Sequence, residues 1–223
     1  MKKKGVLLIV IVLGAVIIIG FFFILPLFDE NTNRYSHTIN IDGVNDFNIN
    51  ENFTTSALNY YGYIAWDQDF IYFGMQGVDI DSSSSNFWVL IYIGNGGTGT
   101  TNGITYNNQD PILPFSATHH VRWRADNSYT NAMEWTGSWT DASWDFTGDV
   151  YQSGQFLEIR IPIADLGSPS EVSVHMSIVN EPGDWTYAGV PSTSFSNGND
   201  PDYTQYFHFD LDGTEVPTDY NPL

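Results

Sequence analysis

The strongest constraint on the fold is the alternation of apolar and polar side chains in Gln155–Gly167. The apolar members recur at every second position: Leu157, Ile159, Ile161 and Ile163. A period of two predicts a strand with one buried and one solvated face. Pro162 cannot donate to a strand ladder, so we expect this strand to lie at a sheet edge or to end there. Glu158 and Arg160 would share the solvated face and meet cross-strand partners.

From Tyr35 onward the chain shows one strand pattern after another and no helical period. The expected strands are Thr38–Ile41, Tyr60–Trp66, Phe70–Val78, Phe87–Ile93, His119–Ala125, Tyr129–Thr136, Glu171–Val179 and Tyr203–Leu211. Phe87–Ile93 is apolar throughout, which indicates a central strand covered on both faces. Short turns predict two hairpins, one through residues 67–69 and one through residues 126–128. We expect an all-β fold, an antiparallel β-sandwich of about nine to eleven strands.

Three segments interrupt these patterns and are expected to be loops. Gly94–Pro114 is rich in Gly, Asn and Thr, Trp139–Asp149 combines tryptophan with aspartate, and Glu181–Asp202 is rich in Gly, Pro, Ser and Asn. Loops of this length inside a compact domain usually carry function or move.

The amino-terminal segment predicts a membrane anchor. Residues 1–4 contain three lysines and form a basic tip, and residues 5–28 carry no charge. A helix of about 20 apolar residues spans a bilayer, and the basic flank would stay in the cytoplasm. We therefore expect a single-pass protein of the cell membrane with its carboxyl-terminal domain outside. A secretory signal peptide is the competing interpretation, but its apolar region is usually about 7–15 residues long and ends in a small-x-small cleavage site, which this run lacks. We therefore favour an anchor, or a signal that stays uncleaved.

The opening Lys-Lys-Lys-Gly-Val-Leu-Leu-Ile also resembles the processing site of archaeal type IV pilin-like proteins, which are cut after the glycine. That resemblance implies a filament-forming surface protein that self-assembles. In either case residues 29–37 would be a spacer, residues 38–212 the sandwich and residues 213–223 a polar tail.

Charge and cysteine content exclude several classes of function. Beyond Arg34 the chain carries three arginines against 24 acidic residues, a net charge of −21. Such a surface repels nucleic acid and anionic lipid, and it suits neutral ligands such as sugars, or bound cations. Cysteine is absent, which excludes disulfides, thiol catalysis and cysteine-ligated metals.

Three motifs, in this order, resemble family 9 carbohydrate-binding modules and the related DOMON-like domains. They are Ile41-Asp42-Gly43 with Asp46-Phe47, Trp66–Gly74 (Trp-Asp-Gln-Asp-Phe-Ile-Tyr-Phe-Gly), and Phe156–Pro162 followed by Asp165-Leu166-Gly167. The resemblance implies a jelly-roll or DOMON-like sandwich that binds sugars on aromatic side chains, often with bound calcium. Some relatives bind haem instead. The family's sugar-clamping tryptophans lie outside these motifs and cannot be carried over to residues of this chain.

The tryptophans and arginines of the predicted loops and strands are the candidate ligand-binding residues. Sugars stack C–H patches on aromatic rings and need planar polar partners for their hydroxyls. The candidates are Arg122, Trp123, Arg124, Trp135, Trp139, Trp144 and Trp185. The alternative is that Trp66, Trp88 and Trp123 fill the core and that the arginines pair with acids.

Closely spaced acids are the candidate calcium ligands, because Ca²⁺ takes six to eight oxygens. We name Asp67 with Asp69 and Asp79 with Asp81 first; Asp141 with Asp145 and Asp210 with Asp212 are further pairs. His119 and His120 are adjacent on a strand and point to opposite faces, which is poor geometry for a shared metal. Haem would need axial ligands across one cavity. Met75 and Met176 have the phase of core residues, so a haem-carrying electron-transfer domain is the third and least favoured hypothesis.

No H-E-x-x-H, G-x-S-x-G or P-loop motif is present. A glycosidase carboxylate pair has no sequence pattern and stays open, but glutamates are few and Glu158 is assigned to a sandwich strand. We therefore expect a non-catalytic, membrane-anchored module that binds a glycan at the cell surface.

Overall fold

The protein is an all-β chain built from antiparallel sheets. A computed structural model describes residues 34–223, and residues 35–223 form one compact unit. The expected anchor at residues 5–28 lies outside the described residues, as do the basic tip and residues 29–33 of the spacer. Among the helices within 34–223, none is long and apolar enough to cross a membrane.

The first sheet has five strands in the order β1-β2-β3-β11-β10, all antiparallel. Their bounds are β1 Asn52–Thr54, β2 Tyr61–Trp66, β3 Phe70–Gln76, β10 Val150–Ser153 and β11 Phe156–Pro162. The hairpin predicted through residues 67–69 joins β2 to β3 and is confirmed. The strand β11 does end at Pro162, but it lies between β3 and β10 and not at an edge.

The second sheet has seven strands. Six follow the order β13-β12-β4-β7-β8-β9, and the seventh, β14, pairs with the first half of β12, on the edge where β13 pairs with the second half. The bounds are β4 Phe87–Gly94, β7 His119–Arg124, β8 Thr130–Trp135, β9 Trp139–Asp141, β12 Glu171–Asn180, β13 Trp185–Val190 and β14 Phe207–Asp210. A separate ribbon pairs β5 (Thr100–Asn102) with β6 (Ile112–Ala117). The hairpin through residues 126–128 joins β7 to β8 as predicted.

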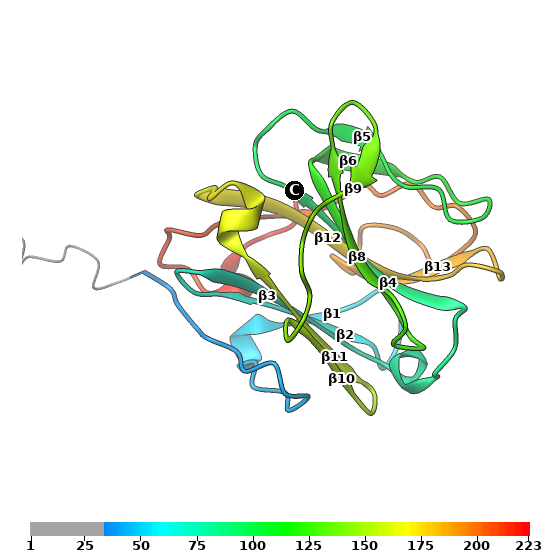
Figure 1. The fold of residues 1–223 in the computed structure, drawn as a ribbon, viewed down its shortest axis with the longest axis horizontal. Coiled ribbons are helices and arrows are strands. Elements are labelled where there is room, and N and C mark those ends of the chain that lie inside the picture. Colours follow the sequence, from blue (N-terminus) through cyan, green and yellow to red (C-terminus); the bar gives the residue numbers. More distant parts are fainter. Residues whose placement is uncertain (1–33) are drawn as a thin grey trace, which may run out of the picture. The chain divides into compact units, whose positions relative to one another are not determined.

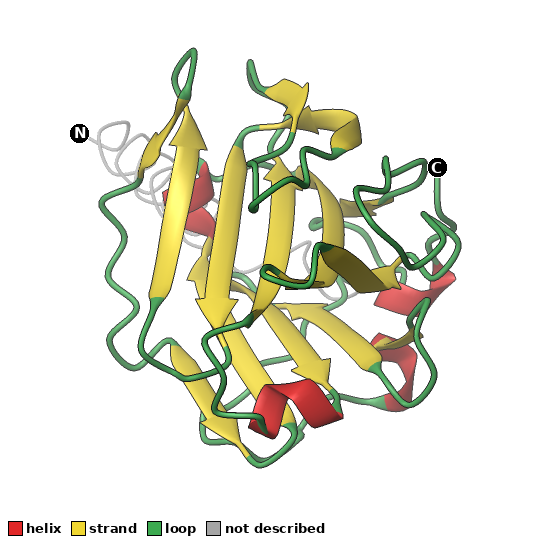
Figure 2. Cartoon of the chain, turned by 90° about the vertical axis from the view of Figure 1, so that its right-hand side faces the viewer, coloured by secondary structure: helices red, strands yellow, loops and turns green. Residues whose placement is uncertain are grey.

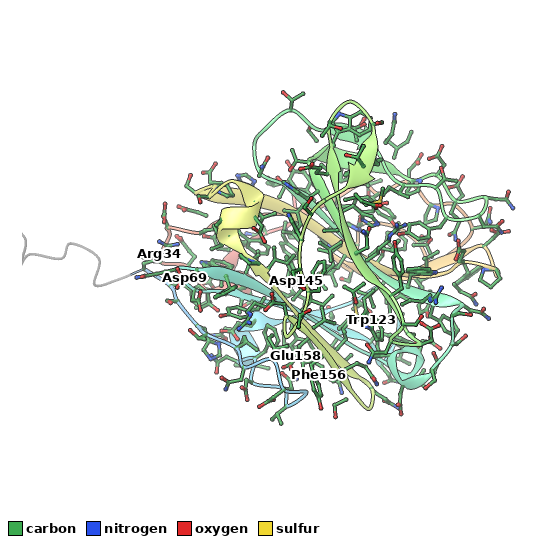
Figure 3. The ribbon with its side chains drawn as sticks, viewed as in Figure 1. Arg34, Asp69, Trp123, Asp145, Phe156 and Glu158 are labelled. Atoms are coloured by element: carbon green, nitrogen blue, oxygen red, sulfur yellow. The ribbon has the colours of Figure 1, made fainter. Side chains whose placement is uncertain are left out.

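The two sheets face each other across one apolar core, which makes the fold a β-sandwich (Figure 1). The first sheet contributes Trp66, Phe73, Met75 and Ile159, and the second contributes residues that include Trp123 and Met176. In Figure 3, Trp123 lies between the two layers. Figure 2 shows how strands dominate the domain, with short helical turns only at its margins. These single turns are η2 Ile49–Glu51, η3 Val78–Asp81, η4 Ile163–Leu166 and η5 Pro217–Asp219.

The outer face of the first sheet is covered by the chain segment that precedes it. Ile39 is buried against Ala65 and Tyr72, and the Phe47 ring packs 5.3 Å from that of Tyr63. The sequence predicted a strand at Thr38–Ile41, and that prediction is wrong. These residues form no strand and instead cover the sheet. The prediction that β11 has a solvated face is wrong for the same reason, because Glu158 is fully buried.

The outer face of the second sheet is also covered, here by residues 95–117 and 191–206. Tyr92 of β4 is buried against Phe115 of the first segment and Tyr203 of the second. The central strand β4 is thus enclosed on both faces, as its apolar sequence predicted. The predicted loops contain strands as well: β5 and the start of β6 in Gly94–Pro114, β9 in Trp139–Asp149, and β13 in Glu181–Asp202.

The segments expected to flank the sandwich, a spacer before residue 38 and a polar tail after residue 212, both contribute residues that pack against the sandwich. Tyr35 lies in edge contact with the Trp66 ring at 4.7 Å, so the sandwich begins three residues before residue 38. In the expected polar tail, the Tyr220 ring lies 5.2 Å from that of Phe209, and Leu223 N donates to the Tyr206 carbonyl.

Candidate functional site

Two neighbouring depressions open beside the residues that follow β4. The first, called here the Trp135 pocket, has a volume of about 360 Å³. Its walls include Asn95, Thr118, His119, Glu134, Trp135 and Asp165. The strands explain the grouping, because β4 ends just before Asn95, β7 begins at His119, and β8 ends at Trp135. Asp165 comes from η4, directly after β11.

His119 is held rigidly at the wall of the Trp135 pocket. Its imidazole stacks on Trp144 with 5.3 Å between ring centroids, and its Nδ1 lies 3.0 Å from the Thr118 hydroxyl. Burial lowers the pKa of His119, and the Glu134 and Asp165 carboxylates oppose that shift only in part. The side chain is therefore a neutral imidazole at pH 7 and offers hydrogen bonds without a positive charge.

Trp135 is the aromatic member of the wall, and a second tryptophan supports it. Trp135 and Trp139 are directly paired across β8 and β9, with their rings edge to face at 5.7 Å. Trp139 is fixed in turn, because its indole N–H donates to the Asn102 carbonyl over 3.1 Å. A ring braced in this way loses little rotamer entropy when a ligand stacks on it.

Asn95 separates the Trp135 pocket from the second depression. Its side-chain NH₂ donates to the Leu166 carbonyl over 2.8 Å, and its Oδ1 accepts from Gly97 N at 2.9 Å. The second depression, of about 440 Å³, has Asn95 and Gly97 in its own wall and extends to His208. The two hollows therefore share one partition.

Of the predicted ligand-binding residues, three gather at this end of the sandwich. Trp135 lines the pocket, Trp139 braces it, and Trp144 packs behind His119. The prediction that Trp123 contacts a ligand is wrong. Its ring is fully buried in the core, where no ligand can reach it.

The arginines and Trp185 lie elsewhere. Arg124 pairs with Asp126 at 2.9 Å and lies 5.3 Å from the Trp88 ring, while Arg122 lies over Tyr129. Trp88, opposite Arg124, is near the start of β4, and the Trp135 pocket is at its other end. Trp185, 48% exposed, lies at that far end too. An eight-residue strand places the two ends about 23 Å apart.

The acidic pairs named as calcium ligands are already engaged in part. Asp67 accepts four hydrogen bonds, from Thr38, Tyr72 and two backbone N–H groups that follow it. Asp79 accepts from the hydroxyls of Tyr60 and Tyr187. Across residues 34–223, no three acidic or histidine side chains stand close enough together to hold a metal ion. Calcium at Asp67 with Asp69, or at Asp79 with Asp81, stays a prediction.

Several pocket residues were not predicted as ligand contacts. Glu134, Asp165 and Asn95 lie at strand ends or in turns, where the sequence alone does not show which ends meet. Asp165 belongs to the Asp-Leu-Gly turn, which the motif resemblance places in the framework of the sandwich. Alternation in β8 sends the side chains of Glu134 and Trp135 to opposite faces, so the sequence does not predict that both residues border one pocket.

The residue types around the Trp135 pocket are those that contact neutral, hydroxyl-rich ligands. The pocket combines one braced indole with two carboxylates, an amide and a neutral imidazole around a hollow of about 360 Å³. Small-molecule sites commonly have volumes of about 300–1,000 Å³ and a few convergent polar groups. No family model matches the chain, and no curated protein or solved structure matches it either.

Proposed function

We propose that the protein binds a glycan in the Trp135 pocket, as a membrane-anchored, extracellular module of the carbohydrate-binding and DOMON-like kind. The observation that carries the proposal is the meeting of Trp135 with Glu134, Asp165 and Asn95 in one pocket. Aromatic rings stack on the C–H faces of sugars, and planar carboxylate and amide groups accept and donate to the hydroxyls.

The charge of the domain supports a neutral ligand. Glu134 and Asp165 are two of the 24 acids beyond Arg34. They would repel phosphate or carboxylate groups and disfavour an anionic partner. Because His119 is neutral at pH 7, its Nε2 and Nδ1 can take part in hydrogen bonds of either direction.

The jelly-roll or DOMON-like identity, the helix across residues 5–28 and calcium bracing of the loops belong to the same proposal. The uncharged run of 24 residues after three lysines supports the anchor. The pilin-like alternative predicts a mature chain that starts at Val6, which mass spectrometry of the amino terminus would detect.

The direct test is a binding screen of the full chain in detergent micelles. Affinity electrophoresis in gels with neutral polysaccharides, together with a glycan array, would detect binding to at least one neutral glycan. If neutral polysaccharides and the array all fail to retain the protein, the proposal is refuted.

A further inference from the structure

The second depression contains a serine, a histidine and a carboxylate in a row. Ser173 Oγ lies 3.1 Å from His208 Nδ1, and His208 Nε2 lies 3.5 Å from Glu171 Oε2. All three residues line the hollow of about 440 Å³. The row is independent of the Trp135 pocket, apart from the shared partition.

The sheet fixes this row. Ser173 and His208 are directly opposite each other on the antiparallel strands β12 and β14, so their side chains emerge side by side on one face. Glu171 precedes Ser173 by two residues and projects on that same face. The outer face here is open, with His208 39% and Glu171 60% exposed at the side chain.

We propose that Ser173 is a nucleophile that cleaves carboxylic esters, with His208 as its general base and Glu171 as the group that orients the imidazole. When Nε2 carries the ring proton toward Glu171, Nδ1 is free to accept the proton of the Ser173 hydroxyl. A nucleophile and base within hydrogen-bond reach, with a third group that orients the base, is the arrangement that activates serine.

The reaction balances with water as the only co-reactant. Ser173 Oγ bonds to the ester carbonyl carbon as its proton passes to Nδ1 of His208. The carbon–oxygen bond to the alcohol then breaks, and the imidazolium returns that proton to the leaving oxygen. Water, deprotonated by the same nitrogen, attacks the acyl carbon; the bond from that carbon to Ser173 Oγ then breaks, Nδ1 returns the proton to Oγ, and the carboxylic acid leaves.

The glycine-rich turn after β4 places one backbone N–H, which has no acceptor among the described residues, in the wall of this hollow, and we assign the oxyanion to it. Gly96 lines the same hollow, and a Cβ at this position would meet no atom within 4 Å. Within residues 34–223, no acceptor is found for the Gly96 N–H. Backbone N–H groups directed at the developing oxyanion are a large catalytic term in acyl transfer.

The walls indicate a small acyl group. Phe115 and Tyr206, with rings 4.9 Å apart, form the apolar side of the hollow. The partition at Asn95 places the row beside the Trp135 pocket, so the alcohol would be a glycan hydroxyl. This last point rests on the proposed function, whereas esterase activity does not.

No sequence motif indicates this activity, because Ser173 lies between two valines and not in a G-x-S-x-G turn. The expectation of a non-catalytic protein rested largely on the absence of sequence motifs. Residues that meet across two strands form no continuous sequence motif, so that expectation did not address them.

The test is active-site labelling of the full chain in detergent with a fluorophosphonate probe, followed by peptide mapping, and hydrolysis of p-nitrophenyl acetate. We expect the label on Ser173 and at least tenfold faster hydrolysis than with heat-denatured protein. Ser173→Ala should abolish both signals, and His208→Gln should reduce both at least tenfold. Ser196→Ala, which changes an exposed loop serine outside the hollow, should leave both unchanged.

Absence of label on Ser173, or hydrolysis that survives Ser173→Ala in a folded variant, overturns the proposal. Circular dichroism of each variant establishes that it is folded. The probes contain no sugar, so failure of glycan binding with retained labelling would refute only the glycan as the alcohol. Failure of labelling with retained glycan binding would refute only the esterase.

Discussion

The backbone N–H of Gly43 donates to Glu158 Oε2 over 2.7 Å and joins two motifs that lie 115 residues apart. Asp42 N donates to the same oxygen at 3.1 Å. Glu158 is fully buried beneath the segment that covers the outer face of the first sheet. The carboxylate therefore fastens the amino-terminal cover to strand β11; Glu158 is labelled in Figure 3.

Removal of that carboxylate should loosen the cover. Glu158→Ala removes the acceptor of two part-buried hydrogen bonds, each of which contributes about 1–2 kcal/mol, between the neutral and the fully charged case. We expect a loss of roughly 2–4 kcal/mol in the free energy of unfolding, measured by equilibrium urea denaturation. The control Glu215→Ala changes an exposed glutamate and should cost less than about 0.5 kcal/mol. Equal stability of the two variants would contradict this role.

Gly43 itself should not tolerate a side chain. Its φ is +84°, and a Cβ there would come within 2.5 Å of Ser153 Cβ. Gly148 has a similar φ of +79°, but a Cβ added to it would meet no atom within 4 Å. Gly148→Ala should therefore report the backbone strain alone, about 1 kcal/mol, and Gly43→Ala the strain plus the clash, at least about 2 kcal/mol. Thermal unfolding of the two variants measures the difference, and an identical melting temperature would count against the close packing of this turn.

The sequence predicted the elements that local patterns determine. The β2–β3 and β7–β8 hairpins, the enclosed strand β4 and the end of β11 at Pro162 all follow from periodicity and turn residues. These features depend on neighbours along the chain, which a sequence shows directly.

The sequence did not predict what distant segments cover or bring together. The burial of Glu158 depends on residues 39–47, which fold over β11 from far along the chain. The strand β13 was missed because glycine, proline and serine surround its short apolar run. Of the ligand site, Trp135 was predicted, but the sequence does not show that Asp165, in the turn η4 after β11, lies beside the end of β8.

Two buried histidines should make the domain sensitive to acid. Burial holds the pKa of His120 at about 3, helped by the positive charge of Arg122, and burial alone holds the pKa of His175 at about 3. In the unfolded chain both would titrate near pH 6.5. The unfolded state therefore binds more protons below pH 6.5, and stability falls as the pH drops from about 6.5 toward 3.

The expected slope is roughly 1.4 kcal/mol per pH unit for each histidine. Urea denaturation at pH 7, 6 and 5 measures it above the range in which ordinary carboxyl groups titrate. The variant His175→Gln should be less stable at pH 7, because it loses the stack on Tyr203 at 4.0 Å. It should also show a slope lower than wild type by the contribution of one histidine, about 1.4 kcal/mol per pH unit. A stability that stays constant from pH 7 to pH 5 would contradict the assignment of both histidines as neutral and buried.

The most direct test of the glycan-binding account is isothermal titration of the full chain with its best neutral oligosaccharide, for wild type, Trp135→Ala and Trp185→Ala. Trp135 lines the pocket, whereas Trp185 is an exposed tryptophan at the opposite end of the second sheet. We predict that Trp135→Ala weakens the affinity about tenfold, which corresponds to about 1.4 kcal/mol, and that Trp185→Ala changes it less than twofold. Unchanged affinity in a folded Trp135→Ala variant, or an equal loss in both variants, would contradict the account.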